Sequence, residues 1–361
     1  MFIVAHNGAR IWGGAERATV SLLKGLRDRG HQVLLLCNDP LVETESVSRG
    51  VPAEICVVGG DVALGHAYRL ASVLKRHKPD AFIVGTYKKL FLASLGARMA
   101  GVPRIVARVG LESDTPRSLK YHIALKRWTD GVVVNGRRMA TAFTSLEGFD
   151  PSKVRVIWNG VESRHPPPDP MKVRQDLGIR SDTFVIGTVA RLALQKRIDR
   201  LLDVTALLPD VVCIIAGDGT RRDELMEKTR SLGIEERVRF LGSREDVGDV
   251  FAALDVFVVT SESEGLSNSM LEAMSYGLPV VSTDVSGAED ALSPEEGGLG
   301  AGIVTGFEPQ SIADAIASLK RDAATRGLMS RIARGRAVSR FSPEQMLSAW
   351  EEFLGPQLHS A

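Results

Sequence analysis

Short apolar runs rich in β-branched residues alternate along the chain with longer stretches in which apolar and charged residues recur at helical spacing. Several runs are apolar at every position, as strands buried on both faces of a parallel sheet are. This alternation is typical of βα units, so we expect an α/β fold. In the first half the expected strands are Phe2–Ala5, Val33–Cys37, Ile55–Val58, Ala81–Gly85, Arg104–Val109, Gly131–Asn135 and Val154–Trp158, with helical patterns such as Glu16–Arg29 and His66–His77 between them.

A proline-rich stretch, His165–Pro170, divides the chain, because proline fixes φ and removes a backbone donor. The alternation then resumes, and 361 residues suit two α/β domains of roughly 150 residues each. We expect domains over 1–162 and 163–341, and a helix with a tail over 342–361. The second set of expected strands is Phe184–Ala190, Val211–Ala216, Val238–Leu241, Val256–Thr260, Pro279–Thr283 and Gly302–Val304.

Composition adds little to this picture, but charge is distributed unevenly. The chain is 44% apolar with a net charge of +1. Residues 1–162 carry 23 Lys and Arg against 14 Asp and Glu, and residues 163–361 carry 22 against 30. The basic half is either a solvated surface or a face that an anionic membrane attracts. We expect buried reduced cysteines, no signal peptide, no membrane span and no nucleic-acid partner.

The densest candidate for chemistry is Ser261–Val281, which leaves an expected strand, turns at Gly265 and enters a helix at Ser267–Asn268. A helix that starts at the carboxyl end of a parallel strand directs unpaired N–H groups and partial positive charge outward. Such a helix start can hold a phosphate. Glu264 before it and Glu272 within it could each bind vicinal hydroxyls. Alternatively, Glu264 caps the helix and Glu272 forms a surface ion pair.

Two further segments could complete a phosphate site. Arg191 follows the strand Phe184–Ala190 and Lys196 opens the next helix, where both could neutralise a diphosphate leaving group; otherwise they decorate a solvated helix. Gly13 and Gly14 follow the first strand, and glycines there let backbone N–H groups approach phosphate. Gly217 lies in a similar turn after Val211–Ala216.

In combination, these segments resemble the retaining glycosyltransferases of family 4, which have the GT-B architecture. The matching pieces occur in the family's order and cover nearly the whole chain. They are GGAER at 13–17, WNGVE at 158–162, VARL at 189–192 with Lys196, AGDG at 216–219, RFLG at 239–242, and Glu264 and Glu272 within EGLSNSMLEAMSYGLPVVSTD. The resemblance implies two Rossmann-like domains facing across a cleft, with a C-terminal helix that crosses back to the first domain.

The resemblance also implies roles for individual residues. Arg191 and Lys196 would hold the donor diphosphate, with the Gly13–Gly14 turn facing it from the first domain. Glu264 would act with them in catalysis by binding the donor sugar, together with the backbone of Gly265, Leu266, Ser267 and Asn268. Glu272 would bind the ribose. Gly217 would lie on the same rim, and the nucleobase would stack near Arg239 and Leu241.

The acceptor side departs from the family pattern. Many members carry a histidine after the strand equivalent to Arg104–Val109, and this chain has none there. Arg108, Glu112 or His122 could take that place. The segment 115–138 is basic and amphipathic, so it is either a solvated helix or one that lies at a membrane interface.

The sequence therefore predicts a metal-independent, cofactor-free, retaining transferase. It would move a hexose or N-acetylhexosamine from a nucleotide sugar, with UDP-sugars favoured. The expected acceptor is a lipid-linked glycan or surface polysaccharide precursor, and the expected location is the cytoplasm, on the inner face of the plasma membrane. The alternatives are a phosphorylase or epimerase acting on nucleotide sugars, and a non-catalytic protein that binds them.

Overall fold

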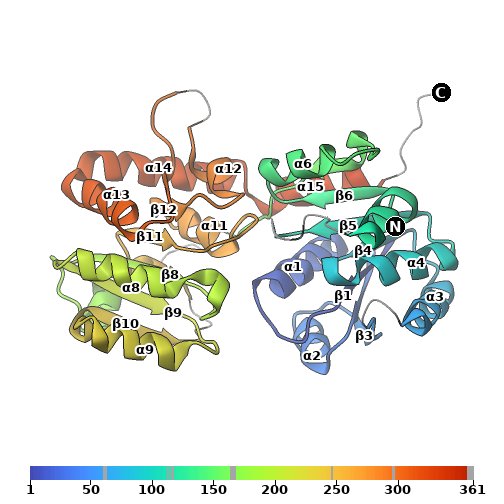
Figure 1. Ribbon diagram of the computed structural model, residues 1–361, viewed down its shortest axis with the longest axis horizontal. Helices are drawn as coiled ribbons and strands as arrows, with labels where there is room; N and C mark the ends of the chain where they lie inside the picture. The colour runs from blue at the N-terminus through green and yellow to red at the C-terminus, as the bar shows by residue number, and fades with distance from the viewer. Residues whose placement is uncertain are drawn as a thin grey trace. The chain divides into compact units, whose positions relative to one another are not determined.

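The computed structural model describes residues 1–59, 63–111, 114, 118–162, 168–244, 247–294 and 297–355. These residues form two compact units (Figure 1). Unit 1 combines Met1–Gly160 with the segment that starts at Pro343, and unit 2 is Val161–Ser342. Each unit contains one parallel sheet with helices on both faces. The fold is thus the expected pair of Rossmann-like α/β domains.

Unit 1 is built on a seven-stranded parallel sheet in the order β3-β2-β1-β4-β5-β6-β7. Its strands are β1 (Phe2–Asn7), β2 (Gln32–Cys37), β3 (Ala53–Ile55), β4 (Ala81–Val84), β5 (Arg104–Val109), β6 (Gly131–Val134) and β7 (Val154–Val156). Its helices are α1 (Gly14–Asp28), α2 (Pro40–Ser48), α3 (Leu64–His77), α4 (Leu90–Ala100), α5 (Leu119–Ile123), α6 (Arg137–Thr144) and α15 (Pro343–Leu354), with a π-helical turn at Ala124–Trp128 and 3₁₀ turns at Tyr87–Lys89 and Pro151–Lys153.

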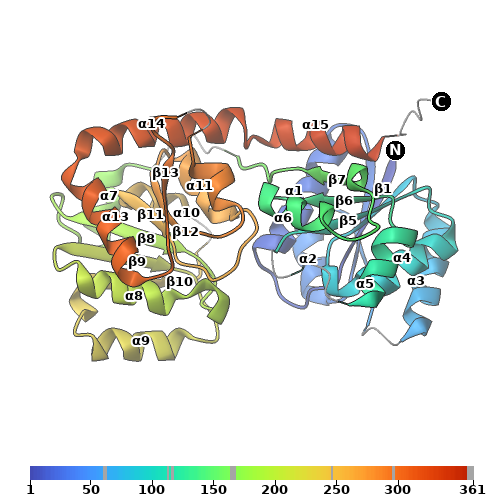
Figure 2. The same cartoon turned by 45° about the horizontal axis from the view of Figure 1, so that its top comes forward.

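The C-terminal helix α15 is part of unit 1 although the whole of unit 2 precedes it in sequence (Figure 2). Its Trp350, 2% exposed, and Phe353 belong to the same apolar cluster as Ile3 of β1 and Leu23 of α1. Arg29, at the end of α1, forms ion pairs with Glu344 and Glu351 of α15. This helix therefore covers one face of the first sheet.

Unit 2 is built on a six-stranded parallel sheet in the order β10-β9-β8-β11-β12-β13. Its strands are β8 (Phe184–Val189), β9 (Val211–Ala216), β10 (Val238–Gly242), β11 (Val256–Val259), β12 (Val280–Thr283) and β13 (Gly302–Thr305). Its helices are α7 (Pro170–Asp176), α8 (Ile198–Leu207), α9 (Arg222–Ser231), α10 (Val247–Ala253), α11 (Asn268–Ser275), α12 (Ala288–Leu292), α13 (Pro309–Arg321) and α14 (Ala323–Ser339), with 3₁₀ turns at Leu194–Lys196 and Glu235–Arg237.

Most strands begin and end within one or two residues of their predicted bounds, but β3 does not. It pairs as Ala53–Ile55 at the sheet edge, whereas the apolar run predicted Ile55–Val58. The prediction was wrong because Cys56 and Val58 are buried within the loop that follows β3 instead of lying in a strand. In the predicted linker, His165–Pro170, residues 165–167 lie outside the described part of the chain. Pro170 already opens α7, with Asp169 as its N-cap.

Each sheet has one point where successive connections run in opposite directions, between β1 and β4 in unit 1 and between β8 and β11 in unit 2. The loops that leave the carboxyl ends of two such strands diverge, and a crevice opens between them. Ligands of open α/β sheets bind at such points. We therefore expect a ligand site of each unit to lie at this point of its sheet.

His6, at the end of β1, lies at this point of unit 1 and is fully buried. Its Nε2 is 3.2 Å from Oδ1 of Asn38, and Asn38 in turn bonds both backbone groups of Val58. Burial, together with the nearby charge of Lys89, lowers the pKa of His6 to about 4. His6 is therefore neutral in the folded protein near neutral pH.

The buried histidine predicts a pH-dependent stability of unit 1. The unfolded chain binds a proton at His6 near pH 6.5, whereas the folded chain does so only near pH 4. The free energy of unfolding should therefore fall as pH drops through this window, by up to about 3 kcal/mol from His6. All four tryptophans lie in unit 1, so urea unfolding followed by their fluorescence reports on it. The variant His6→Gln should lose this part of the pH dependence, and equal slopes for both proteins would contradict the assignment.

Candidate functional site

The site in unit 2 is built from the two loops that leave β8 and β11. Arg191 and Lys196 lie in the loop between β8 and α8, and Glu264 lies between β11 and α11. The Lys196 ammonium forms an ion pair with the Glu264 carboxylate. Residues 68 positions apart in sequence thus meet across the point where the chain direction reverses. The structure brings together the two segments that the sequence singled out.

Glu264 is an interior carboxylate, only 6% exposed. It accepts a hydrogen bond of 2.8 Å from the Ser261 hydroxyl in addition to its pairing with Lys196. The alternative that Glu264 caps the helix is wrong, because Ser267 is the N-cap of α11 and its hydroxyl accepts from the Met270 amide. Burial of a carboxylate without a capping role is unusual unless it is paired.

Helix α11 begins beside this pair, as predicted. Ser267 and Asn268 stand at its start, and the Ser267 hydroxyl lies 3.2 Å from that of Ser269. Leu266 is buried, so only its backbone can face a ligand, and the Gly265 carbonyl accepts from the Gly287 amide at 3.0 Å. The helix N-terminus supplies partial positive charge and unpaired N–H groups for an anion.

A small pocket lies at this position. It is lined by Thr188, Ala190, Lys196, Val259, Thr260, Ser261, Glu264, Ser267 and Ser269. Most of these side chains end in a hydroxyl or a charge, so the pocket matches a polar, oxygen-rich ligand better than an apolar one.

Arg191 differs from Lys196 in having no partner. Its side chain is exposed and, within the part of the chain that the structure describes, no side chain or carbonyl pairs with its guanidinium. Glu272 lies one turn inside α11 and is half-buried. The predicted roles of Arg191 in binding phosphate and of Glu272 in binding ribose stay predictions.

Gly217 supports the Arg191 loop through its backbone. Its φ is +138°, and a Cβ there would lie 1.9 Å from the Ala190 carbonyl oxygen. Its N–H donates to the Gly242 carbonyl at 2.7 Å. The glycine is thus needed for the close packing of the loops after β8 and β9, and its amide already has a partner.

Arg239 and Leu241 both lie within β10, on the far side of β9 from the switch point. The Arg239 guanidinium turns back to the carbonyls of Glu236 and Val238 at the amino end of the strand. Leu241 lies nearer the carboxyl end, where the other predicted residues lie. The predicted contact of Arg239 and Leu241 with the nucleobase stays a prediction.

In unit 1, the Gly13–Gly14 turn begins α1. Gly13 is the N-cap, and its amide donates to the Glu16 carboxylate at 3.1 Å. The Glu16 carboxylate thus already accepts from the Gly13 amide, one of the N–H groups that were predicted to approach phosphate. Gly14 is the first helical residue, and its role in donor binding stays a prediction.

The structure describes two of the three residues that were predicted for the acceptor side. Arg108 lies near the carboxyl end of β5 and donates to the Thr19 hydroxyl at 3.0 Å and to Oδ1 of Asn159 at 3.1 Å. Burial lowers its pKa to about 10, with Glu16 opposing the shift. Arg108 therefore links three segments of unit 1. His122 is half-buried on the short helix α5, and Glu112 lies outside the described residues.

Residues that the sequence did not single out hold the two loops of unit 2 together. The Gln195 carbonyl accepts from the Glu262 amide at 2.9 Å, and its side-chain amide donates to the Ser263 carbonyl at 2.5 Å. The Thr260 hydroxyl donates to the Lys196 carbonyl at 3.1 Å. The only indication of these contacts in the sequence is that Gln195 precedes Lys196 and that Glu262 lies two residues before Glu264.

The described residues contain no group of three or more His, Cys, Asp or Glu side chains placed to hold a metal ion. Arg191 and Lys196 are the cations of this site that could oppose a diphosphate. Independence from metal stays a prediction.

Comparisons with known proteins place both units in glycosyltransferase families. The family described as Glycosyltransferase Family 4 matches residues 12–165, and the one described as Glycosyl transferases group 1 matches residues 171–336. Together the two matches cover most of unit 1 and nearly all of unit 2.

Similar proteins share both units with this chain. It is 28% identical over 356 residues to the lipopolysaccharide core biosynthesis glycosyltransferase LpsE of Rhizobium meliloti, covering 95% of this chain and 96% of that protein. It is 26% identical to the UDP-Gal:alpha-D-GlcNAc-diphosphoundecaprenol alpha-1,3-galactosyltransferase of Escherichia coli, covering 91% and 90%. The crystal structure of Anabaena HepE in complex with UDP and glucose matches with a TM-score of 0.84 and 27% identity over 98% of both chains.

The different surroundings of the two cations predict different effects on stability. Lys196→Ala leaves the buried Glu264 without its cation and should lower the free energy of unfolding of unit 2 by about 1–3 kcal/mol. Arg191→Ala removes an exposed, unpaired side chain and should change it by less than about 0.5 kcal/mol. Urea unfolding followed by circular dichroism reports on both units, and tryptophan fluorescence isolates unit 1. Equal losses in the two variants would show that the Lys196–Glu264 pair does not stabilise the fold.

Proposed function

We propose that this chain, which belongs to the family 4 glycosyltransferases of the GT-B fold, moves a hexose or N-acetylhexosamine from a nucleotide diphosphate to a glycan acceptor. The transfer retains the anomeric configuration and uses no metal. The proposal is supported chiefly by the placement of Lys196, Glu264 and the start of α11 at the switch point of the second sheet.

The site offers separate groups for the two parts of a donor. Arg191, Lys196 and the N-terminus of α11 suit the diphosphate, because they carry positive charge and stand at the carboxyl end of the sheet. Glu264 and the serine hydroxyls of the pocket suit sugar hydroxyls. In the free protein Glu264 already holds Lys196. Donor binding therefore gives the lysine a second anionic partner beside the carboxylate.

In the proposed mechanism, Arg191 and Lys196 hold the leaving group, and no side chain of the protein acts as a nucleophile. As the bond between the anomeric carbon and the diphosphate oxygen breaks, negative charge grows on the diphosphate, and Arg191 and Lys196 stabilise it. The acceptor hydroxyl forms the new bond to the anomeric carbon on the same face. Its proton passes to an oxygen of the departing diphosphate, so no enzymic base is required.

The donor and acceptor classes are proposed from related proteins. HepE structures contain UDP, UDP-glucose, or UDP with glucose, which favours a UDP-sugar as the donor. The Escherichia coli relative acts on a sugar linked to diphosphoundecaprenol, and the Rhizobium relative takes part in lipopolysaccharide core synthesis. We therefore propose a lipid-linked glycan or surface polysaccharide precursor as the acceptor.

A lipid-linked acceptor makes membrane contact by unit 1 part of the proposal, with the protein at the inner face of the plasma membrane. In the described part of the chain, no helix is both long and apolar enough to cross a membrane. The basic stretch that includes α5 and the following π-helical turn instead presents Leu119, 76% exposed, and the exposed Lys126 and Arg127. Such a mixture suits the interface of an anionic bilayer.

The donor can be identified by thermal shift with a panel of UDP- and GDP-sugars, because a ligand that binds the folded state raises its melting temperature. Turnover of the stabilising sugar nucleotide with a lipid-linked acceptor, followed by NMR of the product, should give the donor's own anomeric configuration. Product of inverted configuration would contradict the mechanism. Interconversion of the sugar nucleotide alone, or phosphate-dependent product, would indicate an epimerase or a phosphorylase, and binding without turnover would indicate a non-catalytic protein.

Both cations of the clamp should be needed for turnover. Arg191→Ala and Lys196→Ala should each lower kcat about 10²–10³-fold, since each removes stabilisation of the leaving group. The matched control is Arg230→Ala, which removes an exposed arginine of α9 whose ion pair is to Glu227 on the same helix. Near-native turnover in Lys196→Ala would overturn its assigned role.

Membrane contact is tested by sedimentation with vesicles that contain anionic lipid at low salt. Binding should fall at least about tenfold in the double variant Lys126→Glu/Arg127→Glu, because each basic residue near the surface contributes about 1 kcal/mol. The control Arg180→Glu/Arg230→Glu changes the net charge equally on exposed residues of unit 2. Equal losses in both variants would mean that only the net charge matters.

A further inference from the structure

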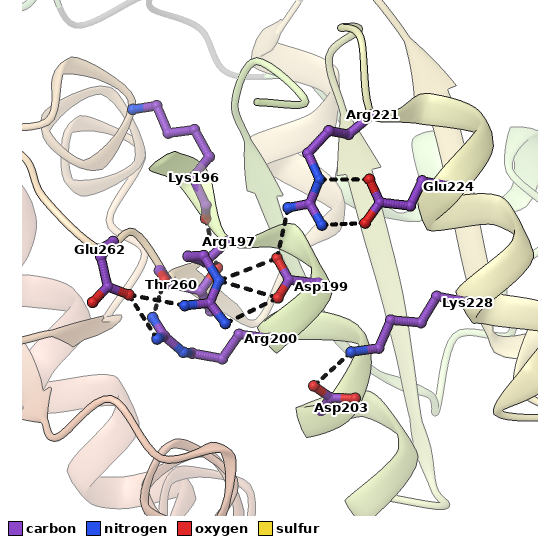
Figure 3. Close-up of polar contacts among 10 residues, drawn as sticks. All are labelled: Lys196, Arg197, Asp199, Arg200, Asp203, Arg221, Glu224, Lys228, Thr260 and Glu262. Carbon is purple, nitrogen blue, oxygen red and sulfur yellow. Dashed lines mark hydrogen bonds and ion pairs between the residues drawn. The ribbon is translucent and has the colours of Figure 1, made fainter. Parts of the chain in front are cut away.

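Charged side chains form a connected network directly behind Lys196 (Figure 3). It contains three arginines and three carboxylates, so it carries no net charge. Its members are Arg197, Asp199, Arg200, Arg221, Glu224 and Glu262. Because its charges cancel, the network is not itself a site for phosphate. The Lys196 side chain points away from it (Figure 3).

Glu262 joins the network to the loop that carries Glu264. Its carboxylate accepts from Arg197 at 3.0 Å and from Arg200 at 2.9 Å. Its backbone amide donates to the Gln195 carbonyl, one residue before Lys196. One residue thus connects two helix-side arginines to both loops of the donor site.

Arg200 is the buried member of the network, 6% exposed. Besides Glu262, it donates to the Thr260 carbonyl at 2.7 Å, and Thr260 in turn donates to the Lys196 carbonyl. A single guanidinium of α8 therefore fixes the end of β11. Its planar fork serves two acceptors at once, which a lysine ammonium cannot do with the same geometry.

Arg197 gives the Lys196 loop its shape. Its φ of +48° lies in the left-handed region, which costs a side-chain-bearing residue roughly 1–2 kcal/mol. Ion pairs with Asp199 and Glu262 hold it there. This turn directs the Arg197 guanidinium into the network while Lys196 points away toward Glu264.

We propose that Glu262, Arg197 and Arg200 are positioning residues of the glycosyl transfer. They hold the Lys196 loop against the Glu264 loop, so that the cation meets the leaving group in the transition state. The inference rests on the proposed function, since it assigns these residues to the same donor site. None of the three needs to touch the donor.

The sizes of the effects on stability and on turnover distinguish a positioning role from a merely structural one. Glu262 has a side chain that is 54% exposed, and an ion pair of that kind contributes only about 0–1 kcal/mol to stability. A structural role therefore predicts a small effect on folding and an equally small effect on turnover. A positioning role predicts a loss of turnover far larger than the loss of stability, because displacement of a reacting group by about 1 Å costs up to about 10²-fold in rate.

The test compares two substitutions that each neutralise one carboxylate. Glu262→Gln should lower kcat about 10–100-fold, with a smaller change in the KM for the donor and an unchanged KM for the acceptor. Asp203 lies on α8, the helix of Arg200, but outside the network, and Asp203→Asn breaks its ion pair with Lys228 of α9 (Figure 3). This substitution should leave kcat unchanged. Arg200→Lys keeps the charge but cannot serve both acceptors, so its kcat should lie between those of the wild type and Arg200→Ala.

Two kinetic results would overturn the proposal. One is wild-type kcat in Glu262→Gln, and the other is a loss of kcat that matches the loss of stability in every variant. Amide hydrogen exchange over residues 259–266, measured without donor, tests positioning independently of activity. It should be faster in Glu262→Gln and unchanged in Asp203→Asn, and equal rates would also overturn the proposal. A wild type that turns over no sugar nucleotide refutes the proposed function instead, and the exchange measurement still decides whether the loops are held.

Discussion

The ion pair between Lys196 and Glu264 is the contact on which the donor site depends. It joins the loop after β8 to the loop after β11 at the one place in the second sheet where adjacent strands send their connections in opposite directions. Around it, the Ser261 hydroxyl, the Gln195 backbone and the Thr260 hydroxyl fix the same two loops. With the pair in place, a cation, a carboxylate and the start of a helix occupy one small volume. In the proposed function, a donor would be held there at both its phosphate and its sugar.

Lys196 and Glu264 would each be unfavourable at this position without the other. A carboxylate that is 6% exposed would be destabilising by itself, and an isolated lysine beside a helix N-terminus would face like charge. Because the two charges are opposite, each partner reduces the free-energy cost of the other. The charges available to a ligand are then those of Arg191, which no described residue neutralises, and the helix terminus. In the proposed function, selectivity for an anionic donor would therefore depend on exposed Arg191 at least as much as on the paired lysine.

Much of the fold could be predicted because both sheets are parallel. Strands such as β8 and β11 are buried on both faces, so their sequences are largely apolar runs with sharp ends. The start of α11 could be predicted from Ser267, because helix caps are local. Edge strand β3 was misplaced because it is short and only part of its apolar run pairs.

The partners within the site could not be predicted, because they are distant in sequence. Glu264 and Lys196 were identified separately, and only the fold shows that they pair. Arg108 was chosen as an acceptor residue from its place near the end of a strand, yet its guanidinium donates hydrogen bonds to Thr19 and Asn159. The left-handed φ of Arg197 carries no signal in a single sequence. Local patterns thus locate the candidate residues, and tertiary contacts decide what each can do.

The central claim is the position of the donor diphosphate, and a crystal structure with bound UDP tests it most directly. The account predicts the β-phosphate within hydrogen-bond distance of Arg191, Lys196 and the backbone amides at the start of α11, with the ribose toward Glu272. A diphosphate bound elsewhere in unit 2, or against the first sheet alone, would contradict it.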